Sequence, residues 1–130
     1  MADSYTVRTD IGKIVVSNNS IREIVQAAVD KFDGRVYITN RKGRPQGRFG
    51  DEARDIDITV SEGRLRIRTY IVIRFGISIH LVTNEIAEDI KNGIETVTGQ
   101  KPAVVSLVVA GVMSAKLAKR DIEVVKEYDD

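Results

Sequence analysis

Residues 21–32 place apolar side chains at three- and four-residue intervals, the spacing that gives an α-helix one apolar stripe. Ser20 and Glu23 stand three residues apart at the start of this segment. That spacing is typical of a capping box, in which a hydroxyl and a carboxylate satisfy free amides of the first turn. Gly34 suits the left-handed backbone with which many helices end. We therefore predict a helix over residues 21–32.

A second apolar stripe of the same kind extends over residues 79–97. Ser78 precedes it and suits the capping position, because its hydroxyl can accept from an amide of the first turn. Gly99 followed by Pro102 favours an end close to Thr98. The sequence therefore predicts a second helix that begins after Ser78 and ends at about Thr98.

Strand patterns, either alternating or rich in β-branched residues, occupy much of the remaining chain. They cover residues 12–17, 35–39, 55–60, 64–75 and 103–112. Glu62 and Gly63 suit a two-residue hairpin turn between the third and fourth of these segments. Such a turn pairs Asp57 with Arg68 and apolar residues with each other, whereas a three-residue loop would set an isoleucine against an arginine. We therefore predict a hairpin with the two-residue turn.

The order of these elements is strand, helix, three strands, helix and strand. It predicts an α+β fold, a two-layer sandwich with two helices on one face of a mostly antiparallel sheet. We assign residues 1–112 to this single domain. Its long loop, residues 40–54, has a length typical of functional or disordered loops. Residues 113–130 are predicted to be a charged C-terminal extension. One face of a helix in this extension is predicted to carry Leu117, Val124, Val125 and Tyr128.

Composition places the chain in a broad class. It has 130 residues, 42% of them hydrophobic, which is enough for one domain with its own core. It has no cysteine, so disulfides, thiolate metal sites and cysteine nucleophiles are excluded. The first ten residues lack the basic and apolar regions of a signal peptide. The longest apolar stretch, residues 103–113, is shorter than the about 20 residues of a membrane-spanning helix. We therefore expect a small soluble domain.

Titratable groups of the kind that catalysis needs are few. His80 is the single histidine, and zinc would need three or four ligands, for which the chain offers no suitable spacing. Glu85, Glu88 and Asp89 share one helical surface, where carboxylates are usually only solvated. The glycines of residues 43–50 do not fit a phosphate-binding loop, because the required Lys-Ser or Lys-Thr is missing. We predict no catalytic residue, metal, cofactor or small-molecule substrate; an enzyme built around the histidine and these carboxylates is the most distant hypothesis.

Charge is unevenly distributed along the chain. Residues 41–74 carry nine basic against five acidic residues, whereas residues 76–130 carry six against nine. The bases of the first segment are almost all arginine, which suits bidentate contacts to phosphate and carboxylate. The even-numbered side chains of the long strand share one face with each other. We predict a patch for a polyanion or a protein partner, made of Arg41, Lys42, Arg44, Arg48, Arg64, Arg66, Arg68, Tyr70 and Arg74.

Three interpretations of this patch stay open. It can be a solvated sheet face whose arginines discourage edge aggregation. A basic strand face beside an Arg/Gly loop is also typical of a module that binds RNA or anionic lipid. Nucleic-acid-binding sheets, however, interleave several aromatic residues for base stacking, and here Tyr70 stands alone. The third interpretation is a protein interface, since tyrosine and arginine are common interface anchors.

Several segments carry a family resemblance. Gly-Lys-Ile-Val-Val-Ser at residues 12–17 is followed by a helix pattern, and Arg-Ile-Arg-Thr-Tyr-Ile-Val-Ile-Arg-Phe-Gly-Ile-Ser-Ile occupies residues 66–79. A helix pattern and the valine-rich residues 105–112 come after them. In this order the segments resemble the opening, the central strand with its glycine junction, and the closing strand of the alkaline shock protein 23 family. The resemblance covers residues 12–112.

The resemblance implies a non-enzymatic protein of the envelope stress response, of the kind found widely in Gram-positive bacteria. It implies a cytoplasmic protein that works near the membrane in cell-envelope homeostasis. The expected partners are further copies of the chain and a small membrane-anchor protein. The family brings no catalytic residues, so none are transferred to this sequence.

Overall fold

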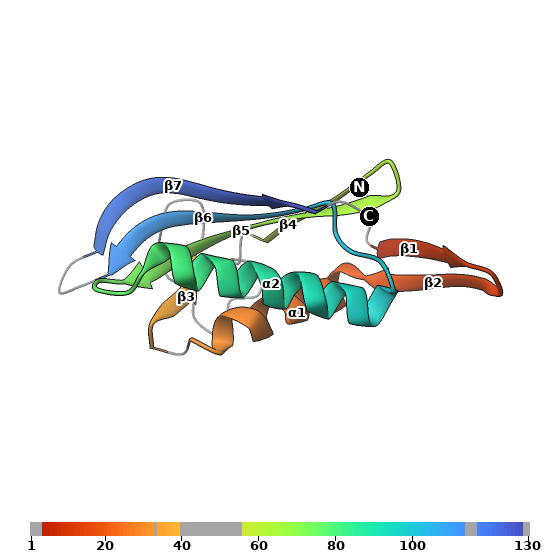
Figure 1. Cartoon of the computed structure of the whole chain (residues 1–130), viewed down its shortest axis with the longest axis horizontal. Coiled ribbons are helices and arrows are strands. Elements are labelled where there is room, and N and C mark those ends of the chain that lie inside the picture. Colours follow the sequence, from red (N-terminus) through yellow and green to blue (C-terminus); the bar gives the residue numbers. More distant parts are fainter. Residues whose placement is uncertain (1–3, 33, 40–55, 114–116, 129–130) are drawn as a thin grey trace.

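The computed structural model describes residues 4–32, 34–39, 56–113 and 117–128, and these residues confirm the α+β class (Figure 1). The predicted long loop, residues 40–54, lies outside the described residues. In chain order the elements are β1 (Ser4–Thr9), β2 (Gly12–Ser17), α1 (Asn18–Asp30), β3 (Val36–Ile38), β4 (Ile56–Ser61), β5 (Arg64–Arg74), α2 (Ile79–Thr98), β6 (Val104–Met113) and β7 (Leu117–Glu127).

The main sheet is built around β5, which pairs along both of its edges. Along one edge of β5, β4 pairs with residues 64–69 and β3 with residues 71–73, both antiparallel. Along its other edge β5 pairs with β6 in parallel, and β6 pairs with β7 antiparallel. The parallel pair requires a crossover connection, and α2 provides it. The sheet is therefore mostly antiparallel, with one parallel contact at its centre.

The β4–β5 hairpin has the predicted two-residue turn. Glu62 and Gly63 both have positive φ, 54° and 75°, as the tight hairpin turn that matches strand twist requires. Asp57 lies opposite Arg68, and the isoleucines 58 and 67 lie opposite each other, as predicted. The local turn chemistry thus fixes which side chains of β5 face the core.

The two helices confirm their predicted stripes, with corrections at both ends of α1, which ends at Asp30 with Lys31 as its C-cap and not at Phe32 before Gly34. α2 begins after Ser78, whose Oγ accepts a hydrogen bond from the amide of Leu81 at 3.2 Å, and it ends at Gly99 with a φ of 78°. α1 begins earlier than predicted. Its N-cap is Ser17, whose Oγ accepts from the amide of Ser20 at 3.2 Å. The predicted capping box is wrong because an equally suitable serine three residues upstream takes the capping position.

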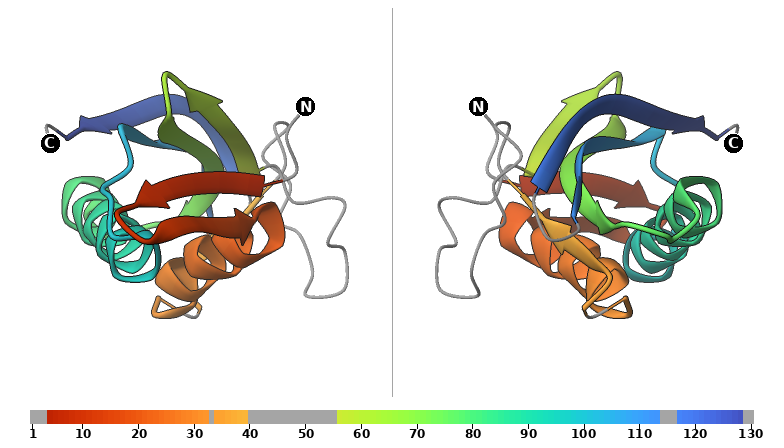
Figure 2. Two further views of the ribbon diagram at one scale, coloured as in Figure 1. Left: turned by 90° about the vertical axis from the view of Figure 1, so that its right-hand side faces the viewer. Right: turned by 90° about the vertical axis from the view of Figure 1, so that its left-hand side faces the viewer.

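The helices and one face of the sheet form a single apolar core. Figures 1 and 2 show both helices on the concave side of the five-stranded sheet. α1 and α2 approach closely where a Cβ added at Gly93 would lie 2.7 Å from Cγ2 of Ile24. Lys31 and Asp89 join the same helices by an ion pair of 3.0 Å. Core residues from β5 are the odd-numbered Leu65, Ile67, Ile71 and Ile73.

The helix predicted for the C-terminal extension is wrong: residues 117–127 form β7, paired along β6. Apolar residues at 117, 124 and 128 fit a helical stripe, but the edge of β6 offers this segment a full ladder of backbone hydrogen bonds. Beyond β7, the Tyr128 ring lies under the ammonium of Lys91 of α2, with 5.5 Å between Nζ and the ring centre. Burial raises the pKa of Tyr128, and the negative charge of Glu88 raises it further.

An N-terminal hairpin extends beyond the sandwich, and only one of its two strands is predicted by the sequence. β2 confirms the predicted strand, whereas its partner β1 has too few apolar residues to be recognised alone. The hairpin projects from one end of the molecule (Figure 1), with Ile11 at its tip 99% exposed. Tyr5 attaches its base, because the ring is buried and the hydroxyl donates to Oε1 of Gln100 at 2.7 Å.

Candidate interaction surface

The face of the main sheet that points away from the helices carries the predicted strand residues. In-register neighbours on adjacent strands point to the same face. The rows of this face run from β5 through β6 to β7, and two of them are Arg66–Val104–Glu127 and Tyr70–Val108–Glu123. We call this surface the outer patch. It consists of Arg66, Arg68 and Tyr70 of β5, Val104, Ser106 and Val108 of β6, and Glu123, Val125 and Glu127 of β7.

Arg64, at the start of β5, supports the fold. Its Nη2 donates to the carbonyl oxygens of Lys101 and Pro102, at 3.2 and 3.3 Å, and the side chain is partly buried. These carbonyls belong to the loop between α2 and β6. Because its guanidinium is engaged by backbone oxygens, Arg64 is a structural residue of this loop, and we leave it out of the outer patch.

Arg68 is neutralised within the chain. Its Nη2 lies 3.4 Å from Oε1 of Glu123, and its guanidinium lies over the ring of Tyr70 at 5.5 Å from the ring centre. β6 separates the strands of these two charged residues, so their side chains meet above it. Asp57 faces Arg68 from the other side, on β4. The basic character that the sequence predicts for this position is therefore balanced by two acidic neighbours.

Arg66 and Glu127 differ from that pair. They stand in the same row, on either side of Val104, and both are exposed. Among the described residues, the side chain of neither one makes a hydrogen bond or an ion pair. The outer patch therefore contains one ion pair, Arg68 with Glu123. Beside it lie Arg66 and Glu127, which form no hydrogen bond or ion pair with another described side chain.

The other predicted patch residues lie elsewhere. Arg41, Lys42, Arg44 and Arg48 are outside the described residues. Arg74 is exposed at the far end of β5, and the fully buried Val72 separates it from Tyr70. The structure thus brings together three of the nine predicted residues, Arg66, Arg68 and Tyr70, on one exposed surface.

Sequence reasoning misses the acidic side of this surface. Because the pattern predicts a helix in residues 113–130, nothing in it places Glu123 or Glu127 next to β5. Residues 123–127, Glu-Val-Val-Lys-Glu, do not alternate between charged and apolar side chains, so the sequence gives no strand signal here. As strand residues, Glu123, Val125 and Glu127 all point to the outer face, two strands away from the arginines. The surface is therefore a pair of oppositely charged stripes, with the smaller side chains of β6 between them.

The residues of the enzyme hypothesis do not converge. His80 is exposed in the first turn of α2. Lys91 forms an ion pair of 3.3 Å with the carboxylate of Glu88, and Lys31 forms one with the carboxylate of Asp89. Within the described ranges, no group of three or more histidine, aspartate and glutamate side chains is arranged to hold a metal ion.

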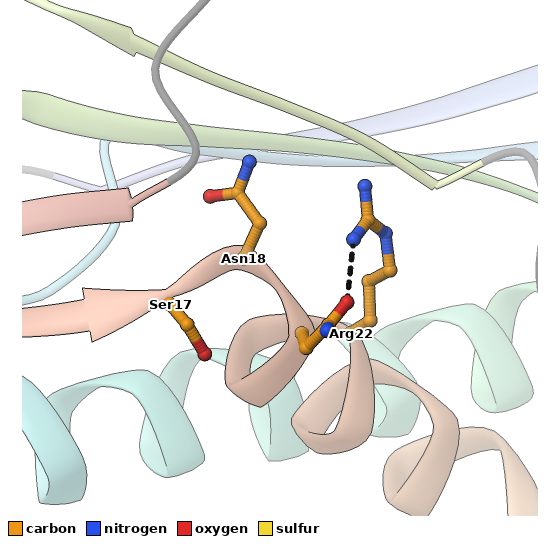
Figure 3. A pocket seen from close by; sticks show the side chains of 4 residues that line it. Ser17, Asn18 and Arg22 are labelled. Atoms are coloured by element: carbon orange, nitrogen blue, oxygen red, sulfur yellow. Dashed lines mark hydrogen bonds between the residues drawn. The ribbon is translucent and has the colours of Figure 1, made fainter.

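A small polar hollow lies where β2 leads into α1 (Figure 3). Its volume is about 340 Å³, and its lining is Ser17, Asn18, Asn19 and Arg22. Arg22 Nη1 donates to Oδ1 of Asn19 at 2.9 Å, and Ser17 caps the helix. These polar groups serve the helix start, and the lining offers no carboxylate or nucleophile paired with a base, so the hollow has no arrangement for chemistry.

In the part of the chain that the structure describes, neither helix has the length and apolar character needed to cross a membrane. Comparison of the chain with curated proteins and with solved structures finds no match. The model of the alkaline shock protein 23 family, described as having a cell envelope-related function, matches residues 6–114. This range includes β1 from Thr6 onward, β2, both helices and the central strands β5 and β6. The chain therefore belongs to the alkaline shock protein 23 family and has a cell envelope-related function.

Proposed function

We propose that this protein serves the cell envelope without catalysis, as a module of the envelope stress response that binds other proteins through its outer patch. The supporting observation is the arrangement of this surface: a basic stripe on β5 and an acidic stripe on β7, two strands apart on one exposed sheet face. Opposite charges at fixed positions give a surface specificity for a complementary protein and determine its orientation.

The same arrangement disfavours a polyanion as the ligand. Phosphate backbones are bound by surfaces of one sign, which neutralise several phosphates at once. On the outer patch, Glu123 and Glu127 would repel such a backbone, and Arg68 already has an acidic partner. Binding of RNA or anionic lipid remains the alternative, and in that case the basic residues at positions 41–48 would have to provide the binding surface.

The cellular setting of the proposal follows from the family. A cytoplasmic protein with an envelope-related role needs a way to reach the membrane, and a small membrane-anchor protein would supply it. In this proposal a protein partner recruits the chain to the membrane by binding to the outer patch. Self-association would multiply such contacts and strengthen recruitment.

The first test is genetic. Cells that lack the gene are complemented with the wild type, with Arg66→Glu, or with the matched control Lys13→Glu, whose position is exposed on the distant β1–β2 hairpin. We expect the wild type and the control to restore growth under envelope stress and Arg66→Glu to fail at equal protein level. Equal rescue by Arg66→Glu would contradict the proposal.

The second test separates proteins from polyanions. The purified chain is incubated with vesicles of anionic lipid and with mixed RNA, at low and high salt. We expect no retention on either, and capture of the chain by membranes that contain their native proteins. Retention on vesicles or RNA that weakens steeply as salt rises would instead support the alternative, because each phosphate contact releases counterions.

A further inference from the structure

The strand edges of the molecule differ in how they are protected from pairing with other chains. An open edge is a row of unpaired amide and carbonyl groups, and proteins usually guard it with charged side chains, proline, a bulge or a very short strand. β7 is guarded by charge, since six of its eleven residues are charged, and β3 has only three residues. In the N-terminal hairpin, each strand carries a long basic side chain, Arg8 or Lys13. The remaining edge, that of β4, differs from all of these.

β4 is a complete and regular strand with one open edge. Its six residues, Ile-Asp-Ile-Thr-Val-Ser, include four β-branched side chains, which favour strands, and no proline. It pairs with β5 along its whole length without a register shift, and its single charged residue, Asp57, stands opposite Arg68. Among the described residues, no strand pairs with the second edge of β4. This edge therefore has the features of a strand that can accept another strand.

Backbone hydrogen bonds determine which residues of β4 present their amides and carbonyls at the second edge. In an antiparallel pair, opposite residues either exchange hydrogen bonds or direct their backbone groups away from each other. The carbonyl of Leu65 accepts from the amide of Ala103, just before β6, at 2.7 Å. Leu65 therefore directs its backbone away from β4, and its partner Val60 directs its own away from β5. Two residues earlier on β4, Ile58 has the same orientation. Both residues thus point their amides and carbonyls toward the second edge.

We propose that the second edge of β4 binds an extended segment of another protein, which adds a strand to the five-stranded sheet. The class of ligand follows from the chemistry of the edge. Amide and carbonyl groups that recur at every second residue are matched by another extended backbone, whereas a helix uses its backbone groups internally. The inference goes beyond the proposed function, because strand addition uses the backbone of β4 and not the charges of the outer patch.

The side chains beside the edge indicate the sequence of the added segment. Val60 is 43% exposed and lies on the inner face of the sheet, with its partner Leu65. Thr59 is exposed on the outer face, opposite Arg66. Side chains of a strand alternate between the two faces, so the added segment needs apolar residues that cover Val60 and polar residues beside Thr59. A run of alternating apolar and polar residues without proline is therefore the expected recognition sequence.

The first experiment measures amide hydrogen exchange of the full chain by nuclear magnetic resonance. The amide of Thr59 points to β5, so those of Ile58 and Val60 should exchange at least about tenfold faster. The probe is a short synthetic peptide of alternating valine and threonine, with a lysine at each end. Its addition should slow exchange at Ile58 and Val60. The same peptide with proline at its centre is the matched control and should leave exchange unchanged.

The second experiment changes the edge itself, with binding of the labelled peptide measured by fluorescence anisotropy. Val60→Pro removes an amide that points away from β5, where edge strands tolerate proline. Loss of this hydrogen bond should weaken binding about fivefold. Val60→Lys keeps the amide but places a charge at the edge, and it should also weaken binding. Val60→Thr keeps both the amide and the β-branched shape and should bind as the wild type does. Circular dichroism of each variant confirms that it is folded.

Several results would overturn the proposal. Equal exchange at Ile58 and Thr59 would mean that the second edge is not open. A peptide that fails to bind at millimolar concentration, or that protects β7 instead, would exclude this edge as the site, as would normal binding by Val60→Lys. If the wild type sediments as a dimer and Val60→Lys as a monomer, the occupant is a second copy of the chain and not another protein. None of these measurements involves Arg66, so the proposed function of the outer patch stands or falls separately.

Discussion

Along β5, the odd-numbered and even-numbered side chains meet different surroundings. Leu65, Ile67, Ile71 and Ile73 are at most 1% exposed and belong to the single core under the sheet. On the other face, residues of one type, the arginines, have three different roles. Arg64 supports a loop, Arg68 forms an ion pair, and Arg66 meets solvent. These four side chains thus share one role, whereas each arginine of the outer face must be understood from its own neighbours.

Alternation along a strand therefore reveals burial but not function. Period-two patterning separates the two faces of a strand, because only one face can reach the core. It does not distinguish an arginine that binds backbone oxygens from one that is exposed to solvent. Substitutions on the two faces should therefore differ greatly in their effect on stability, and outer positions should differ among themselves.

The greatest loss of stability is expected on the inner face. Ile71→Ala removes a fully buried side chain beneath the centre of the sheet. We expect the free energy of unfolding to fall by about 3 kcal/mol, from lost transfer energy and the cavity left behind. Urea denaturation followed by circular dichroism measures this change. The conservative Ile71→Val should cost much less, and equal losses for the two variants would contradict a tightly packed site.

Arg64→Ala should give the next largest loss. The guanidinium donates to the carbonyls of Lys101 and Pro102, and removing it leaves both oxygens without this donor. We expect a loss of about 1.5 kcal/mol, the scale of hydrogen bonds to a charged group. Arg66→Ala, two residues along the same face, is the matched control. If the two substitutions cost the same, Arg64 has no structural role of its own.

Asp57→Arg tests the pairing across the hairpin. The introduced arginine would stand directly opposite Arg68, where like charges destabilise an antiparallel pair by up to about 1 kcal/mol. The melting temperature should fall at low salt and partly recover at high salt, because salt screens exposed charges. Asp57→Asn, which removes a charge without reversing it, should have a smaller effect. If the charge reversal leaves the melting temperature unchanged, Asp57 does not lie opposite Arg68.

Arg66→Ala should change stability least, by no more than about 0.5 kcal/mol, as for other exposed positions without partners. Its thermal unfolding should match that of the wild type within error. Its ability to restore growth under envelope stress, in cells that lack the gene, should nevertheless fall. A large loss of stability would show that Arg66 supports the fold, and the contrast between Arg64 and Arg66 would disappear.

Much of the fold can be predicted because the signals are local. Ser78 and Gly99 bound α2 through hydrogen bonds and a backbone conformation within a few residues of each end. Glu62 and Gly63 fix the hairpin register through their own φ values. The candidate surface can be predicted only in part. Its basic side follows from alternation along β5, but its acidic side requires knowing which strand lies two positions away.

Residue order alone was sufficient for the two helical stripes, the cap and end of α2, the β4–β5 turn and the buried face of β5, because each of these depends on neighbours a few residues apart. Packing in three dimensions was needed to make residues 117–127 a strand, since their sequence pattern indicates a helix and only the edge of β6 favours a strand. It also assigned the roles of the arginines, because the partners of Arg64 and Arg68 are 37 and 55 residues away along the chain. Electrostatic and hydrogen-bonding partners are set by distance in space, which the order of residues does not specify.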